Sequence, residues 1–224
     1  MKKILFVNPS LRLNSPTKFL PVGIASVMSY LQSKNIDFDF LDIDIDELID
    51  QEVEDYLDKN RYDIVLSGSI VTHYKWMKWL TYKIRTYNPK SIIIMGNSVA
   101  GSIPELFLKN SAADIAVVGE GEITTYEIIL KILKNEEWDQ VRGIAFKKPN
   151  GKVQINDKRK GLKKLDEFPM INWENFNTEK YFKKSYAAAK AVNDKEVRVM
   201  PVVTARGCAF RCTFCHFVFW NDPY

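Results

Sequence analysis

Residues 63–118 read DIVLSGSIVTHYKWMKWLTYKIRTYNPKSIIIMGNSVAGSIPELFLKNSAADIAVV. Three runs in this stretch are almost continuously apolar, at 63–66, 91–95 and 114–118, and longer segments of mixed polarity separate them. Unbroken Val and Ile runs are typical of strands buried on both faces, as in a parallel sheet covered by helices. The stretch therefore predicts alternating strands and helices, joined by right-handed crossovers.

Further segments of both kinds lie on either side of this stretch. The other predicted strands are residues 3–8 and 38–43, and the predicted helices are residues 23–33, 48–57, 76–87, 104–109 and 122–133. Five β–α units in succession predict a doubly wound α/β domain with a five-stranded parallel sheet of the Rossmann or flavodoxin type. We assign this domain to residues 1–135.

The pattern changes after residue 135. Two apolar segments, 141–147 and 152–155, flank a Pro-Asn-Gly turn, which predicts a β-hairpin. An irregular aromatic segment follows, with a predicted helix at 180–192. We assign residues 136–196 to a hairpin and linker. A predicted strand at 197–204 then opens a further domain, of which residues 197–224 form the start.

Composition narrows the class of protein. The chain has 224 residues, 27% of them charged, and a net charge of +4 from scattered side chains. These values are typical of a globular protein and do not predict a nucleic-acid partner. No apolar run reaches the roughly 20 residues that span a bilayer. The amino-terminal segment fits a strand better than a signal peptide, so we expect a cytoplasmic protein without a membrane span.

The three cysteines form the most informative cluster. Cys208, Cys212 and Cys215 have the spacing C-x3-C-x2-C, and a disulfide framework would use an even, dispersed set. Three thiolates on one loop can hold a [4Fe–4S] cluster and leave one iron open. A zinc site with His216 as fourth ligand, or three unconnected buried thiols, are the alternatives. The spacing favours a [4Fe–4S] cluster over the zinc site and over unconnected thiols.

The cysteines lie in the sequence VTARGCAFRCTFCHF, residues 203–217. This sequence resembles the signature loop of radical S-adenosylmethionine (radical SAM) enzymes. The resemblance implies that the three cysteines bind a [4Fe–4S] cluster, whose open iron chelates S-adenosylmethionine, and that Phe214 lies against the adenine. It also implies a 5′-deoxyadenosyl radical and a reductant such as flavodoxin or ferredoxin. The protein would position this cofactor chemistry.

The radical SAM barrel needs further β–α units after this loop, and only nine residues follow Cys215. We therefore expect the chain to be the truncated amino-terminal part of a longer enzyme. The parent would be an enzyme, and this chain alone would be inactive.

The α/β domain resembles the cobalamin-binding domain found in one large class of radical SAM enzymes. The likeness lies in PVGIASVMSYLQSKNIDFDFLDID (21–44), DIVLSGSIVT (63–72), IIIMGNSVAG (92–101) and VVGEGEITTYEII (117–129). It implies a cobalamin site formed by Ser67, Ser69, Thr72, Gly96, Asn97, Gly119 and Gly121. The implied parent is a cobalamin-dependent methyltransferase, or a related radical enzyme, that acts on an unactivated carbon or phosphorus; its substrate is unknown.

The sequence lacks several motifs that other cofactor-binding domains contain. No G-x-G-x-x-G or P-loop sequence is present, which argues against dinucleotide and nucleoside triphosphate sites. The loop 8–21 lacks the cobalt-ligating His of methionine-synthase-type domains, and Asn97 replaces a usual Gly. We expect His73, Glu120 and Glu122 to be structural, the two acids through the dipole and capping of the helix they begin. The alternatives are a domain that has lost cobalamin, and a flavodoxin-like binding module with a zinc knuckle.

Overall fold

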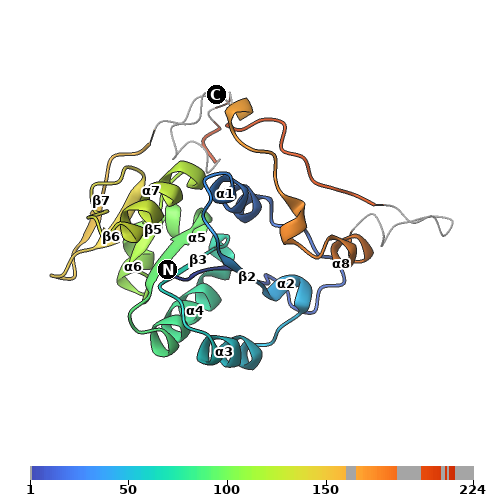
Figure 1. Ribbon diagram of the computed structural model, residues 1–224, viewed down its shortest axis with the longest axis horizontal. Coiled ribbons are helices and arrows are strands. Elements are labelled where there is room, and N and C mark those ends of the chain that lie inside the picture. Colours follow the sequence, from blue (N-terminus) through green and yellow to red (C-terminus); the bar gives the residue numbers. More distant parts are fainter. Residues whose placement is uncertain (1, 160–164, 186–197, 208–209, 211, 215–224) are drawn as a thin grey trace.

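The structure, a computed structural model, describes residues 2–159, 165–185, 198–207, 210 and 212–214. Seven strands in this part of the chain form one sheet, and helices cover both of its faces (Figure 1). The strands are β1 (Ile4–Asn8), β2 (Asp39–Asp42), β3 (Ile64–Gly68), β4 (Ile92–Gly96), β5 (Ile115–Val117), β6 (Ile144–Lys147) and β7 (Val153–Ile155). The α-helices are α1 (Val22–Gln32), α2 (Ile43–Asp46), α3 (Asp50–Lys59), α4 (Tyr74–Tyr87), α5 (Asn97–Gly101), α6 (Pro104–Lys109), α7 (Gly121–Leu133) and α8 (Thr178–Lys183). Short 3-10 helices are η1 (Val71–His73), η2 (Leu165–Glu167) and η3 (Trp173–Asn175).

The order of the first five strands is β2-β1-β3-β4-β5, and each adjacent pair is parallel. The predicted doubly wound parallel arrangement is therefore confirmed. From β1 the chain crosses to β2 on one side, and β3 then lies on the other side of β1. The strand order thus reverses between β1 and β3, and in open α/β sheets ligands bind beyond the carboxyl ends of the strands at such a point.

The sheet is larger than the predicted five strands. β6 and β7 form antiparallel pairs that continue the same sheet beyond β5, whereas the sequence placed them in a linker. Without β6, one edge of β5 would expose unpaired backbone groups. The turn into β6 uses Gly143, whose φ is +77° and whose Cβ, if present, would lie 3.1 Å from Thr124 Oγ1. The hairpin is thereby part of the sheet.

The core lies in two layers, one on each face of the sheet. In β1, Ile4 and Phe6 face one layer while Leu5 and Val7 face the other, as strand alternation requires. Helices α1 and α7 cover the first face, and α3, α4, α5 and α6 cover the second. Both faces of β1, β3, β4 and β5 are therefore buried, which explains the apolar sequences of these four strands, whereas the edge strand β2 is partly exposed.

The aromatic segment after the hairpin also packs on the core. Phe176 and Tyr181 are buried in the layer that contains α1, and the Phe176 ring meets Phe40 of β2 edge-on at 5.0 Å. Phe168 stacks on Tyr30 of α1 at 5.2 Å. The segment thus covers apolar surface that α1 and α7 leave open. The predicted boundaries at residues 135 and 196 stay predictions.

The predictions for the carboxyl-terminal part were less accurate. Residues 198–204 form no strand, although the sequence predicted one at 197–204. No strand in the described ranges pairs with them, and Val202 and Val203 remain exposed. A strand depends on a neighbour for its hydrogen bonds, so apolar sequence alone is not enough. Helix α8 is shorter than predicted, and residues 186–192 of that prediction lie outside the described part of the chain. Within that part, no helix combines the length and apolarity needed to cross a bilayer.

Candidate functional site

The carboxyl ends of β1, β3, β4 and β5 lie at one edge of the sheet, because these strands are parallel. The seven residues predicted to bind cobalamin lie at the carboxyl ends of β3 and β4 or in the segments that directly follow β3, β4 and β5. The loops after β3 and β4 are joined to each other: Val99 N donates to Ser69 O at 2.9 Å, and Val71 N donates to Ser98 Oγ at 3.1 Å. The segments after β3 and β4 therefore form one hydrogen-bonded wall at the carboxyl edge of the sheet.

Gly68 allows this wall to form. A Cβ built on Gly68 would lie 2.9 Å from the backbone oxygen of Gly96, which is closer than side-chain carbons approach. The two glycines end β3 and β4, and they are directly paired in the sheet. Only a residue without a side chain therefore permits this approach.

The predicted serines have internal partners. Ser67 is buried, and its hydroxyl donates to Val7 O at 2.8 Å, which links β3 to β1 beside the switch point. Ser69 is also buried, and its Oγ lies 3.2 Å from Nδ1 of His73. Thr72, in η1, is exposed. Of these three side chains, Thr72 is the one presented at the surface.

His73 has the contacts of a helix-start residue. Its ring stacks on Trp76 at 5.0 Å with an interplanar angle of 5°. Burial lowers the pKa of the imidazole, and the carboxylate of Asp50 offsets this only in part. The ring is therefore neutral at neutral pH, which agrees with the structural role expected for it.

The glycine positions differ in their surroundings. A Cβ built on Gly96 or Gly119 would meet no atom within 4 Å, so the backbone is open at the carboxyl ends of β4 and β5. A Cβ on Gly121 would lie 3.0 Å from Val27 Cγ2 of α1, so Gly121 allows the close contact between α7 and α1. Asn97 is exposed with a φ of +60°, and its Oδ1 accepts from Ser98 N at 2.6 Å. Its side chain thus bonds to the adjacent backbone.

The first loop, after β1, contains a buried lysine. The Lys18 ammonium bonds to the Asp44 carboxylate at 3.0 Å and donates to Leu13 O at 2.9 Å. The ion pair holds the loop against α2, which directly follows β2, and the bond to Leu13 O lies within the loop. Leu11 and Phe19 of this loop, and Ile70 and Val71 of the loop after β3, are exposed apolar side chains at the same edge.

Sequence reasoning missed a buried polar cluster at the ends of β1 and β2. Asn8 Nδ2 donates to Asp42 Oδ1 at 2.7 Å, and the Tyr181 hydroxyl donates to Asp42 Oδ2 at 2.8 Å. Burial raises the pKa of Asp42 to about 6 even though both hydrogen bonds favour the carboxylate. Burial also raises the pKa of Tyr181. No motif signals this cluster, because Tyr181 is distant in sequence.

Glu120 and Glu122 have contacts that the sequence did not predict. Glu120 begins α7, yet its side chain makes no capping hydrogen bond. Glu122 is buried and accepts from Ser26 Oγ and Arg206 Nη2, both at 2.6 Å. Burial by itself would raise the pKa of Glu122, but these hydrogen bonds outweigh it and hold the pKa below its ordinary value. Glu122 keeps the expected place of an acid in the first turn of α7 and adds an ion pair with Arg206, whereas Glu120 makes no capping bond.

The cysteine loop is described only in part. Cys212 is an exposed free thiol, and Phe214 is 91% exposed. Cys208 and Cys215 lie outside the described residues, as does His216. The [4Fe–4S] cluster, the zinc alternative and the adenine contact of Phe214 therefore stay predictions.

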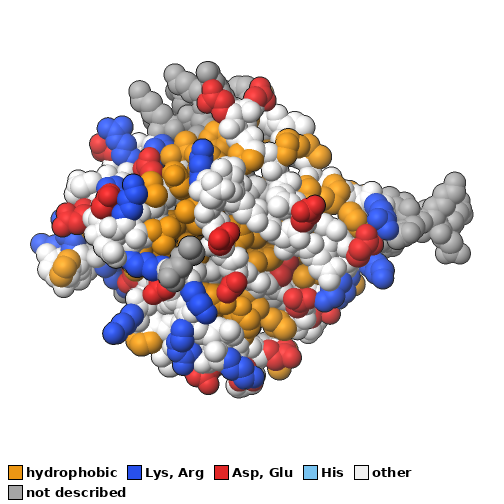
Figure 2. All heavy atoms as spheres, viewed as in Figure 1, with side chains coloured by type: hydrophobic (Ala, Val, Ile, Leu, Met, Phe, Trp, Pro, Cys, Tyr) orange, Lys and Arg blue, Asp and Glu red, His pale blue; other side chains and the backbone are white. Residues whose placement is uncertain are grey.

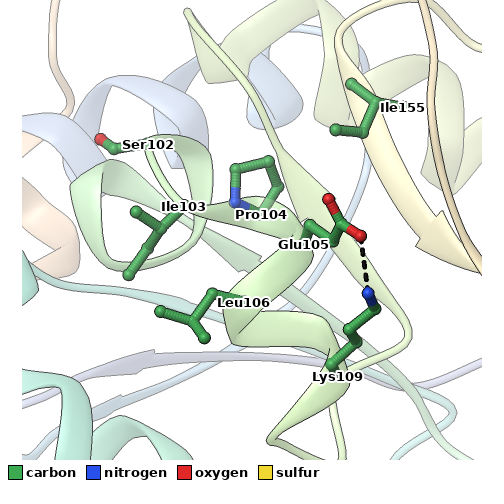
Figure 3. A pocket seen from close by; sticks show the side chains of 7 residues that line it. All are labelled: Ser102, Ile103, Pro104, Glu105, Leu106, Lys109 and Ile155. Atoms are coloured by element: carbon green, nitrogen blue, oxygen red, sulfur yellow. Dashed lines mark hydrogen bonds and ion pairs between the residues drawn. The ribbon is translucent and has the colours of Figure 1, made fainter.

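An open pocket of about 460 Å³ lies between α6 and β7, with Ile155 opposite Pro104 and Glu105 (Figure 3). Glu105 and Lys109 of α6 form an ion pair at its side, at 2.6 Å. Its described lining includes none of the residues predicted to bind a cofactor. On the molecular face in Figure 2, Lys and Arg side chains alternate with Asp and Glu, so this face has no continuous basic surface.

Curated proteins with similar sequences include methyltransferases and other enzymes. Cytidylyl-2-hydroxyethylphosphonate methyltransferase of Streptomyces wedmorensis is 26% identical, over 99% of this chain and 49% of its own length. The 4'-phospho-dehydrooxetanocin synthase of Priestia megaterium is 24% identical, over 95% of this chain and 27% of its own length. The chain thus spans about half the length of these relatives, or less.

Solved structures share the fold. The cobalamin-dependent S-adenosylmethionine radical enzyme OxsB, with aqua-cobalamin bound, has a TM-score of 0.61 and 23% identity, over 75% of this chain and 24% of its own. The radical S-adenosylmethionine methyltransferase TsrM of Kitasatospora setae, with cobalamin and a [4Fe-4S] cluster bound, has a TM-score of 0.61 and 15% identity, over 72% of this chain and 30% of its own. At such identities the likeness is one of fold. Residues 10–129, more than half of the chain, match the family model of the B12 binding domain, and the chain therefore belongs to that family.

Proposed function

We propose that this chain is the amino-terminal, cobalamin-binding portion of a radical SAM enzyme, either a methyltransferase or a related radical enzyme. The observation that carries the proposal is the match of residues 10–129 to the B12 binding domain, followed along the chain by the C-x3-C-x2-C sequence. Relatives named as methyltransferases support the reaction class.

The carboxyl edge of the sheet suits a large, partly apolar ligand such as a corrin. The backbone is open at Gly96 and Gly119, and four apolar side chains, Leu11, Phe19, Ile70 and Val71, are exposed on the neighbouring loops. Exposed apolar surface of this kind marks binding sites. Thr72 lies at the same edge with an exposed side chain that contains a hydroxyl donor. These residues would hold the ligand through backbone and apolar contacts.

The loop after β1 supports a specific form of cobalamin binding. It contains no His, and the ion pair of Lys18 with Asp44 holds it against α2, while the bond of Lys18 to Leu13 O lies within the loop. His73 bonds through Nδ1 to Ser69 and stacks on Trp76. We therefore propose that cobalamin binds without a His from the first loop on cobalt.

In the parent enzyme, Cys208, Cys212 and Cys215 would bind the [4Fe–4S] cluster. When bound, the cluster would supply an electron for cleavage of S-adenosylmethionine, and cobalamin would carry the methyl group. Phe214 would contact the adenine, and a flavodoxin or ferredoxin would supply reducing equivalents.

Titration of the chain with hydroxocobalamin tests the cobalamin part. We expect a saturable shift of the visible spectrum and a corrin that stays with the protein in gel filtration. Gly96→Leu would fill the open space at the end of β4 without strain, because the φ of Gly96 is −130°. An overpacking cost of about 1–3 kcal/mol corresponds to roughly 5- to 150-fold weaker binding.

Lys90→Leu is the matched control, since Lys90 is exposed and precedes the amino end of the same strand. It should bind cobalamin as the unmodified chain does. If the unmodified chain shows no spectral shift and retains no corrin, the cobalamin part of the proposal is wrong.

A further inference from the structure

Arg206 links the segment that leads into the cysteine loop to the α/β domain. Its Nη2 bonds to Glu122 Oε1 at 2.6 Å and to Ser26 Oγ at 2.9 Å, and its Nη1 lies 3.4 Å from Glu120 Oε1. One guanidinium therefore joins the first turn of α7 to α1. Its partners lie between 84 and 180 residues away in the sequence.

The Glu122 carboxylate requires such a partner. Its side chain is only 4% exposed, and a buried carboxylate is strongly destabilising unless a cation and hydrogen bonds compensate for lost hydration. The planar guanidinium can bond to two acceptors at once, which a lysine ammonium does with less geometric definition. The contact thus defines both the position and the orientation of the Arg206 side chain relative to α7 and α1.

The other described contacts of the segment are weaker. Arg198 pairs with Glu179 at 3.0 Å, but both side chains are more than half exposed, and pairs of this kind contribute little. Met200 packs at the margin of the α1 layer, and Val202 and Val203 are exposed. Arg206 is therefore the strongest polar anchor described for residues 198–207.

The anchor joins residues that are adjacent in the sequence to the two proposed cofactor sites. Glu120 directly follows Gly119, whose open backbone is at the carboxyl edge of the sheet, and Arg206 precedes Cys208 by two residues. We propose that Arg206 is a positioning residue, which fixes the entrance of the cysteine loop against the α1–α7 edge. This inference rests on the proposed function, because the groups so positioned would be the cluster and the corrin.

Distances between two spin labels test the anchor in the full chain, without either cofactor. The background carries Ser at the three cysteine positions. Labels are placed at Val202→Cys in the segment and at Lys59→Cys on α3, both exposed sites. In the labelled chain that is otherwise unmodified, we expect one narrow distribution of label-to-label distances. In Arg206→Gln and in Glu122→Gln, we expect a broad distribution instead.

Two further variants separate anchoring from folding. Arg206→Lys keeps the charge and should recover much of the narrow distribution. Arg198→Gln, the matched control in the same segment, should keep it fully. Circular dichroism establishes that each variant is folded, and the double variant Arg206→Gln/Glu122→Gln avoids an unpaired buried charge.

An unchanged narrow distribution in folded Arg206→Gln and Glu122→Gln would overturn the inference. Because no cofactor is present, the result does not depend on cobalamin binding. Failure of the anchor and failure of the proposed function are thus distinguished by separate measurements.

Discussion

Replacement of Asp42 by Asn should change how stability depends on pH. Asp42 lies at the end of β2, where Asn8 and Tyr181 donate hydrogen bonds to it, and burial raises its pKa from 3.8 to about 6. An Asn side chain has a similar shape and keeps an oxygen that can accept from Asn8. It cannot ionise, so it does not carry the cost of a buried charge.

The direction in which stability changes with pH follows from the raised pKa of Asp42. Below about pH 4 the carboxyl is protonated in both the folded and unfolded states, and no charge is buried. Between pH 4 and 6 the unfolded chain releases the proton while the folded chain retains it, so the free energy of unfolding falls as pH rises. A shift of about two pKa units corresponds to about 3 kcal/mol, and above pH 6 this cost is constant.

Urea unfolding, followed by tryptophan fluorescence, measures the effect at several values between pH 4 and pH 7.5. The free energy of unfolding of Asp42→Asn, minus that of the unmodified chain, should increase by about 2.5 kcal/mol across this range, because the unfolded carboxyl is already partly ionised at pH 4. Asp55→Asn, at an exposed position of α3, controls for loss of one negative charge. A difference that is constant, or that decreases with pH, would refute the reasoning.

Two other substitutions, Gly68→Ala and Tyr181→Phe, test the edge of the sheet, and Gly23→Ala in α1 is the control for the first. Gly68→Ala places a Cβ 2.9 Å from Gly96 O and should lower the free energy of unfolding by about 1–3 kcal/mol in urea. Gly23→Ala, in α1 with open space around it, should instead raise it by up to about 1 kcal/mol; equal midpoints for the two would contradict the packing argument. Tyr181→Phe removes the hydroxyl that donates to Asp42 and should cost about 1–3 kcal/mol at pH 7, where the carboxylate is ionised, and less at pH 4. The same loss at both values would argue against an ionised Asp42.

Local sequence patterns predicted most of the α/β domain. The apolar runs located β1, β3, β4 and β5, and the strand-like segment 38–43 located β2, all within two residues of the observed limits. Pro104 and the helical periodicity located α6 and α7. The site edge was also predictable, because the carboxyl ends of parallel strands meet at one side. The strand predicted at 197–204 was wrong. Its sequence is apolar like that of a strand, but no strand within the described residues pairs with it.

By itself, the sequence determined the alternation of strands and helices, the edge that carries the candidate site, and the family of the domain. These depend on residues close together in the chain, whose spacing is visible in the sequence. Tertiary structure alone decided that the hairpin joins the sheet, that Tyr181 donates to Asp42 across 139 residues, and that Arg206 pairs with Glu122 across 84. Such partners are selected by burial, which brings distant polar groups together and requires each to be satisfied.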